Sequence, residues 1–151
     1  MEIELYFSEM LKKLKAISHY EVSEIADQEA RYRAEAGSEK NEQIVRCINE
    51  GMAQAERRCI RYLKERYDKY SDNTLKVPDS VVFDFAMSER RAIGKAEPLA
   101  SCLQDLIVHY ALSMFYSSVS QGDLSNKHSL LAIEAGNVLT DLLYTKQPPR
   151  V

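Results

Sequence analysis

Three histidines, His19, His109 and His128, are the side chains best suited to hold a metal ion or to transfer protons near neutral pH. A di-iron helical bundle needs a glutamate three residues before a histidine on two helices, because that spacing places both ligands on one helix face. None of the three histidines has a glutamate at that position. Asp105 and His109 are four residues apart, which favours a structural hydrogen-bonded pair over two metal ligands. We therefore expect no metal and no cofactor.

Other patterns that carry chemistry are sparse. The sequence has no glycine-rich phosphate loop, no Gly-x-Ser-x-Gly elbow and no His-Glu-x-x-His motif. Its three cysteines, Cys47, Cys59 and Cys102, are odd in number and form no Cys-x-x-Cys pair. We interpret them as small apolar residues of a protein in a reducing compartment. These observations favour a protein that is not an enzyme.

The strongest charge feature is a basic stripe of Arg57, Arg61 and Lys64, which are spaced to share one face of a predicted helix. Such a stripe can meet phosphate groups. Glu56 and Glu65 are interleaved with it, however, which favours a solvated helix face. Contact with nucleic acid therefore stays possible in this interpretation, without base-specific recognition.

Composition indicates one foldable domain. The chain has 151 residues, of which 45% are hydrophobic and 28% charged, with 20 basic against 23 acidic side chains and a net charge of −3. This balance argues against a disordered chain, a general nucleic-acid binder and a membrane-surface protein. The acidic start, Met1 to Glu4, is not typical of a signal peptide, and the most apolar window still contains Gln104 and Asp105. We expect a cytoplasmic protein that does not enter a membrane.

Apolar residues recur at intervals of three and four along most of the chain, starting at Ile3. The sequence therefore predicts a mainly α fold, a four- to five-helix bundle forming a single domain over residues 1–145. The longest helix is expected at about 39–70 and the closing helix at about 127–144. The stretch at about 99–120 is nearly all apolar, which predicts a helix buried at the centre of the bundle.

The segment near 80–88 differs, because apolar residues alternate there with a period of two between Pro78 and Pro98. This alternation predicts one β-like extended segment, and a short helix beginning at Asp79 or Ser80 is the alternative. The segment must pair with another segment of the chain or with another subunit, and because no second strand is predicted we favour pairing between subunits. Its candidate interface residues are Val81, Phe83, Phe85 and Met87.

The C-terminal residues 146–151 contain two consecutive prolines, which cannot continue a helix. We expect an extended C-terminal arm that is either disordered or docked on a partner, and we favour the docked arm. Its candidate interface residues are Lys146, Pro148, Pro149 and Arg150.

From about residue 43 to 144, the order of features resembles the small head–tail adaptor, or neck and connector, proteins of Mu-like tailed bacteriophages. The resemblance rests on patterns of helix packing and on an irregular stretch that contains Val77-Pro78. The segments that carry it are Ile48–Glu56, Ile60–Tyr67, Leu106–Leu112 with Phe115 and Tyr116, and Lys127–Leu143.

The resemblance implies a non-enzymatic structural protein that assembles as a ring between portal and tail. Its partners would be further copies of itself and other virion proteins, in the host cytoplasm and then in the virion. An arm or strand exchanged between neighbouring subunits would account for the extended segment and the C-terminal arm. The alternative function is a cytoplasmic helical scaffold or regulator that acts by binding another protein.

Overall fold

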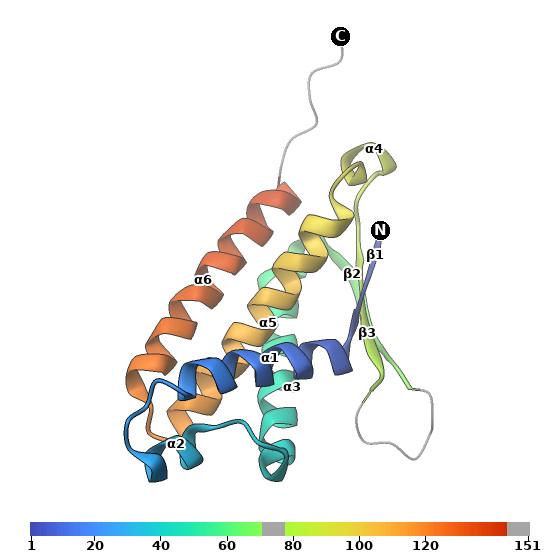
Figure 1. Ribbon diagram of the computed structural model, residues 1–151. Coiled ribbons are helices and arrows are strands. Elements are labelled where there is room, and N and C mark those ends of the chain that lie inside the picture. The colour runs from blue at the N-terminus through green and yellow to red at the C-terminus, as the bar shows by residue number, and fades with distance from the viewer. Residues whose placement is uncertain (71–77, 145–151) are drawn as a thin grey trace.

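The computed structural model describes residues 1–70 and 78–144 (Figure 1). Helices predominate, and three short strands form one antiparallel sheet. Two 3-10 turns, Ser38–Lys40 and Ile60–Tyr62, precede α3 and β2. Within the described part of the chain, no helix is long and apolar enough to cross a membrane. In chain order the elements are β1 (Glu2–Tyr6), α1 (Phe7–Val22), α2 (Gln28–Ala34), α3 (Asn41–Arg58), β2 (Leu63–Lys69), β3 (Ser80–Phe85), α4 (Glu89–Ala92), α5 (Ala96–Ser118) and α6 (Gly122–Tyr144).

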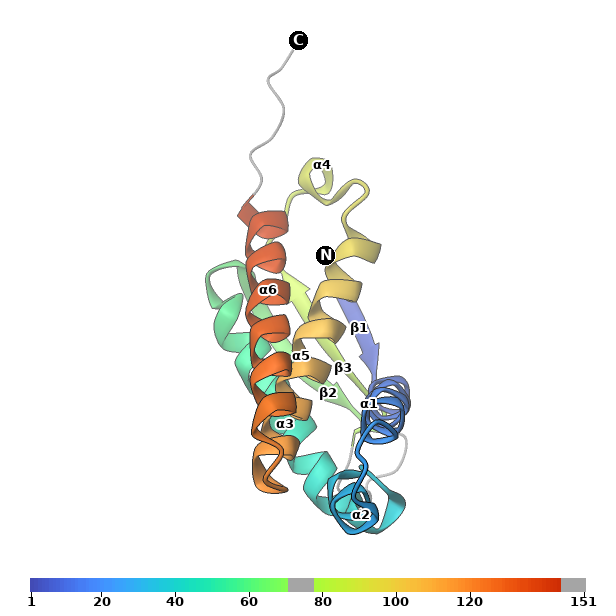
Figure 2. The same cartoon turned by 60° about the vertical axis from the view of Figure 1, so that its left-hand side comes forward.

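Helix α5 occupies the centre of the fold, between the sheet and α6, with α1 and α3 packed against its other sides (Figures 1 and 2). A helix that is apolar most of the way round is stable only when neighbours cover it on every side. This confirms the predicted buried helix at about 99–120. Its buried residues are Leu99, Leu103, Leu106, Ile107, Val108, Ala111, Leu112, Phe115 and Tyr116.

The other helices differ in extent from the prediction. The closing helix predicted at about 127–144 is present, but α6 begins earlier, at Gly122. The predicted helix over 39–70 is correct only as far as Arg58, where α3 ends. The residues after it form a 3-10 turn and then strand β2, so the Ile60–Tyr67 segment of the resemblance is not helical.

The sheet has the order β1-β3-β2, with β3 in the centre and antiparallel to both neighbours. Phe83 of β3 faces Ile3 of β1 on one side and Arg66 of β2 on the other. The extended segment near 80–88 is therefore a strand, and the alternative of a short helix is wrong. The favoured pairing with another subunit is also wrong, because its own chain supplies both neighbours.

Strands β1 and β2 were not predicted from the sequence, for two different reasons. In β1, buried Ile3 and Leu5 alternate with Glu2 and Glu4, but Ile3 also continues the helical spacing of α1 backwards from Phe7. Strand β2 is dominated by charged side chains and has only partly buried or exposed residues, so it reads as the end of an amphipathic helix. Pairing with the strongly apolar β3 makes both segments extended.

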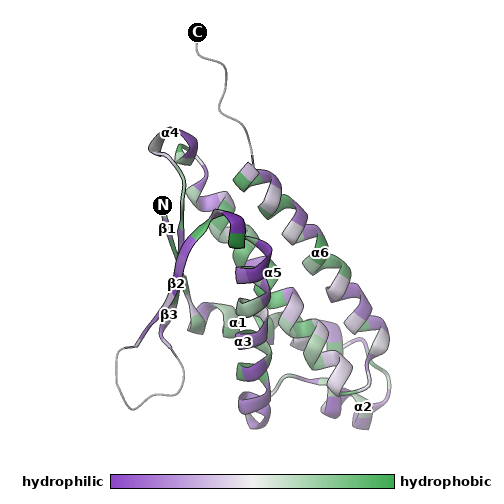
Figure 3. Cartoon of the chain, turned by 180° about the vertical axis from the view of Figure 1, so that it is seen from behind, coloured by the Kyte–Doolittle hydropathy of each residue, from purple (hydrophilic) through white to green (hydrophobic). Residues whose placement is uncertain are grey.

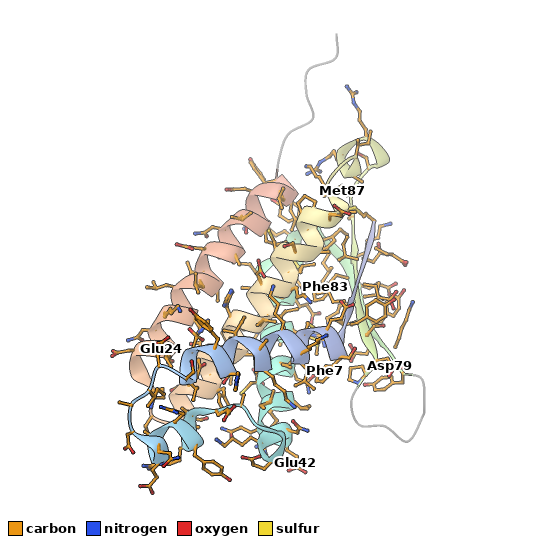
Figure 4. All side chains as sticks on the ribbon, in the orientation of Figure 1. Phe7, Glu24, Glu42, Asp79, Phe83 and Met87 are labelled. Atoms are coloured by element: carbon orange, nitrogen blue, oxygen red, sulfur yellow. The ribbon has the colours of Figure 1, made fainter. Side chains whose placement is uncertain are left out.

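The interface residues predicted on the extended segment belong to the protein's own core. Val81, Phe83 and Phe85 are buried, and Met87 is partly buried against the same core. Phe83 lies on the side of the sheet that faces α5 (Figure 4). The predicted interface at these positions is therefore corrected to a packing role. The C-terminal arm at 146–151 lies outside the described residues.

Helix α3 approaches α5 closely at Gly51. A Cβ atom at this position would lie 2.7 Å from the backbone oxygen of Ile107. The backbone of a buried helix cannot move aside as the end of a flexible side chain can, so glycine is required at this contact.

We predict that Phe83→Ala lowers the free energy of unfolding by about 3–5 kcal/mol, because it leaves a cavity between the sheet and α5. Urea denaturation followed by circular dichroism measures the loss. The matched control is Tyr144→Ala, which truncates an aromatic ring that is 64% exposed and should change stability by less than about 0.5 kcal/mol. A loss below about 1 kcal/mol for Phe83→Ala would show that β3 is not part of the core.

We also predict that Gly51→Ala destabilises the chain by about 1–3 kcal/mol, even though alanine favours helices. The added methyl group must push α3 away from the backbone of α5. Gly122→Ala is the control, since nothing lies within 4 Å of the corresponding Cβ position. Equal stability of the two variants in urea denaturation would contradict the close approach.

Candidate functional site

A buried polar cluster joins three helices that are distant in sequence. At its centre is Glu21 in the last turn of α1, whose side chain is only 6% exposed. Its Oε1 accepts hydrogen bonds from Nε2 of His128 at 2.6 Å and from the hydroxyl of Tyr116 at 3.2 Å. Its Oε2 accepts one from Nζ of Lys127 at 2.7 Å. The cluster therefore connects α1 to both α5 and α6.

A second imidazole extends this chain of hydrogen bonds. Nδ1 of His109 on α5 lies 2.9 Å from Nδ1 of His128, and the two rings are nearly parallel, with their planes 19° apart. One of these nitrogens must donate the hydrogen and the other must accept it. Glu21, His128 and His109 thus form a carboxylate–imidazole–imidazole series.

Local sequence explains how the helices position these groups. Glu21 shares the buried face of α1 with Leu14 and Ser18, which precede it by seven and three residues. His109 and Tyr116 are two turns apart on α5 and point to the same side. His128 takes a buried position on α6, and its neighbour Lys127 reaches the same carboxylate from the more exposed side.

The electrostatics of the cluster favour an ionised glutamate. Burial alone would raise the pKa of Glu21, but hydrogen bonds from Lys127 and His128, with their charges, outweigh it and hold the pKa below its ordinary value. Burial, followed by the nearby His128, lowers the pKa of His109. Burial is also the main cause that raises the pKa of Tyr116, so this phenol stays protonated and donates its hydrogen.

Beside the cluster, residues of α1 and α6 line a cavity of about 390 Å³ that is open to solvent. Its wall is apolar at Ala16, Ile17 and Leu131, with the ring of Tyr20 at the edge, and the polar cluster forms the remaining side. A second hollow of about 200 Å³ lies between α3, α5 and α6, beside Arg58 and Ile133. The larger cavity is the better candidate site, because titratable groups converge on it.

The series can pass a proton between His109 and Glu21 through His128, and it can orient the His109 ring. Among the described residues, no group of three or more histidine, cysteine, aspartate or glutamate side chains is arranged to hold a metal ion.

The predicted pairing of Asp105 with His109 is wrong. Asp105 accepts a hydrogen bond from Nζ of Lys13 on α1 at 2.5 Å, while His109 pairs with His128 on α6. The third histidine, His19, is exposed and lies 2.9 Å from Glu35. Spacing within one helix could not reveal these partners, because each lies on another helix.

All three cysteines lie in or against the apolar core, as expected from the sequence. Cys47 and Cys59 are buried, Cys102 is partly buried, and none of the three forms a disulfide. Burial raises the pKa of the Cys59 thiol to about 12, and it raises the pKa values of the other two. These thiols are therefore poor nucleophiles at neutral pH.

The predicted basic stripe does not form on one helix face. Arg57 lies at the end of α3, Arg61 in the following 3-10 turn and Lys64 in β2, and all three side chains are exposed. The stripe was inferred from helical spacing that stops at Arg58.

Sequence reasoning missed Glu21 and Lys127 altogether. One signal was present for Glu21, which follows Leu14 and Ser18 at the spacing of a buried helix face. A glutamate at a core position needs a partner, and a histidine is the natural candidate. No pattern in the sequence indicated that His128, 107 residues later, would be that partner.

We predict that the chain loses stability as the pH falls below about 6.5. Because the pKa of His109 is lowered in the fold, the unfolded chain binds a proton more readily, and the free energy of unfolding decreases from the ordinary histidine pKa down to the folded value. Glu21 extends the loss, since its stabilisation disappears as the pH drops from about 4.5 through its lowered folded pKa.

Urea denaturation across this range measures the slope, which is at most about 1.4 kcal/mol per pH unit for one proton. His109→Gln should flatten the curve between roughly pH 7 and 5, and Glu21→Gln should flatten it below about pH 4.5. Slopes identical to that of the parent chain in both variants would contradict the assignment.

Comparison with known proteins gives no relative: no family model, no curated protein and no solved structure matches the chain.

Proposed function

We propose that the chain is a non-enzymatic structural subunit that assembles with further copies of itself, as a small head–tail connector of a tailed phage or prophage does. The observation that carries this proposal is the outer face of α6. Large apolar side chains are exposed there although the opposite face is already packed on α5: Leu130 is 63% exposed, Ile133 56% and Tyr144 64%. Figure 3 shows apolar segments recurring along this helix.

The spacing on this face supports contact with another helix. Leu130, Ile133 and Tyr144 lie on one side of α6 at intervals that fit the three-and-four repeat of a helix–helix seam. The repeat positions between Ile133 and Tyr144 are polar, and Asn137, one of them, accepts a hydrogen bond from Arg58 of α3. Exposed apolar residues scattered singly are ordinary, but a row of them on one helix face is typical of an interaction surface. A helix with two such faces is stabilised by burial on both sides.

The connector role itself derives from the sequence resemblance. Two of its four segments, Leu106–Leu112 and Lys127–Leu143, lie within α5 and α6, so the helix pair that presents the outer face carries part of the resemblance. In this proposal the partners are further copies and other virion proteins, in the host cytoplasm and then in the virion. The arm residues Lys146, Pro148, Pro149 and Arg150 remain predicted contacts. Arg57, Arg61 and Lys64 would contact nucleic acid only without base specificity.

We predict that Leu130→Ser weakens self-association, raising the dissociation constant about tenfold or more, because it removes a large, 63% exposed apolar side chain from the seam. Light scattering coupled to size-exclusion chromatography measures the mass over a concentration series. Ile93→Ser is the matched control, since Ile93 is 77% exposed outside this face. A parent chain that stays monomeric at every concentration would overturn the proposal, as would equal effects of the two substitutions.

A genetic experiment tests the connector role separately. In a phage or prophage that carries the gene, its inactivation should leave filled heads and tails that do not join, as seen by electron microscopy. Complete virions would reject the connector role, and self-association alone would then favour the helical scaffold.

A further inference from the structure

Among the polar groups that line the cavity between α1 and α6, His109 has a ring nitrogen whose hydrogen-bonding capacity is not used. Glu21, Lys127 and His128 bond to one another, whereas His109, partly buried in the cavity wall, uses only its Nδ1. Nδ1 of His109 faces His128, so Nε2 lies on the opposite edge of the ring. The described residues provide no hydrogen-bond partner for that nitrogen.

The hydrogen-bond chain assigns the state of this nitrogen when both imidazoles are neutral. Glu21 is ionised and accepts the hydrogen of His128 Nε2, which leaves a lone pair on His128 Nδ1. His109 Nδ1 must then carry the hydrogen between the two rings, and His109 Nε2 carries a lone pair. Because His109 lines the cavity, this lone pair is the imidazole acceptor that a molecule bound against Ala16, Ile17 and Leu131 would meet.

We propose that this cavity binds a neutral, ring-sized apolar molecule that carries one hydroxyl or N–H group, which donates its hydrogen to His109 Nε2. Small-molecule sites combine an apolar wall with a few fixed polar groups, and a volume of about 390 Å³ lies within their usual range. Anions are disfavoured, because the only ammonium group in the wall, that of Lys127, already neutralises Glu21. This site is independent of the outer face of α6 and of the proposed self-association.

The same geometry makes the preference of the cavity for hydrogen-bond donors depend on pH. If the imidazole pair takes up one proton, the hydrogen between the rings remains, and His109 Nε2 carries a hydrogen whichever ring holds the charge. The acceptor then becomes a donor. The charged groups that face His109 are Lys13 and Glu21 on α1, Asp105 on α5 and, beside His128, Lys127 on α6.

Phenol, anisole and toluene are suitable probes, because they have similar size and only phenol carries a hydrogen to donate. Titration of the full chain at pH 8, followed by the imidazole signals in NMR, should show phenol binding about tenfold or more tightly than either of the others. The advantage of phenol over anisole should shrink as the pH is lowered and the pair takes up a proton. Equal affinity of phenol and anisole at pH 8 would overturn the proposal, as would the lack of saturable binding at millimolar phenol.

Two substitutions locate the site. His109→Leu should remove the advantage of phenol while toluene still binds, because the apolar wall remains. Ala16→Phe should abolish binding of all three probes by filling the cavity from an exposed position of α1 that needs no core rearrangement. Ala96→Phe, at another exposed alanine, is the matched control and should leave binding unchanged. Phenol binding that persists in Ala16→Phe would place the site elsewhere and overturn the proposal.

Discussion

The burial of α5 on every side is the constraint on which the other elements depend. A helix of 23 residues with apolar side chains most of the way round must be covered by several elements at once, because any uncovered face would expose large apolar surface to water. The sheet, α1, α3 and α6 supply that cover. Gly51 shows how tight the cover is, since it brings the α3 backbone against the backbone of Ile107.

The buried carboxylate of Glu21 fixes how the helices are placed relative to one another, which apolar packing alone does not do. Hydrophobic contact alone would permit α1 and α6 to shift along α5, whereas a buried carboxylate must keep its partners within hydrogen-bond distance. Lys127 and His128 satisfy it from α6 and Tyr116 satisfies it from α5, so one ionised group fixes the relative positions of three helices. The cavity between α1 and α6 borders this contact, and His109 is held at its edge by the same chain of hydrogen bonds.

Helix α6 connects the interior of the fold with its proposed assembly surface. Its inner face packs on α5 and contributes His128 to the buried cluster, while its outer face presents Leu130 and Ile133 to solvent. A partner that bound the outer face would therefore contact a helix whose position is already fixed by the hydrogen bonds of the buried cluster. In the proposed assembly, the inner contacts of α6 would hold this surface in a fixed position.

The sequence alone was sufficient for the buried helix, for the closing helix and for the strand at Ser80–Phe85, because each has a strong apolar periodicity of its own. It was not sufficient for β1 and β2, in which Ile3 continues a helical pattern and charged residues dominate β2, so that only pairing with β3 makes them strands. Phe83 was predicted to lie at an interface, but because β3 pairs within its own chain, this side chain belongs to the core. Only the tertiary structure brought Glu21 to His128, because a hydrogen bond between residues 107 positions apart leaves no local pattern in the chain.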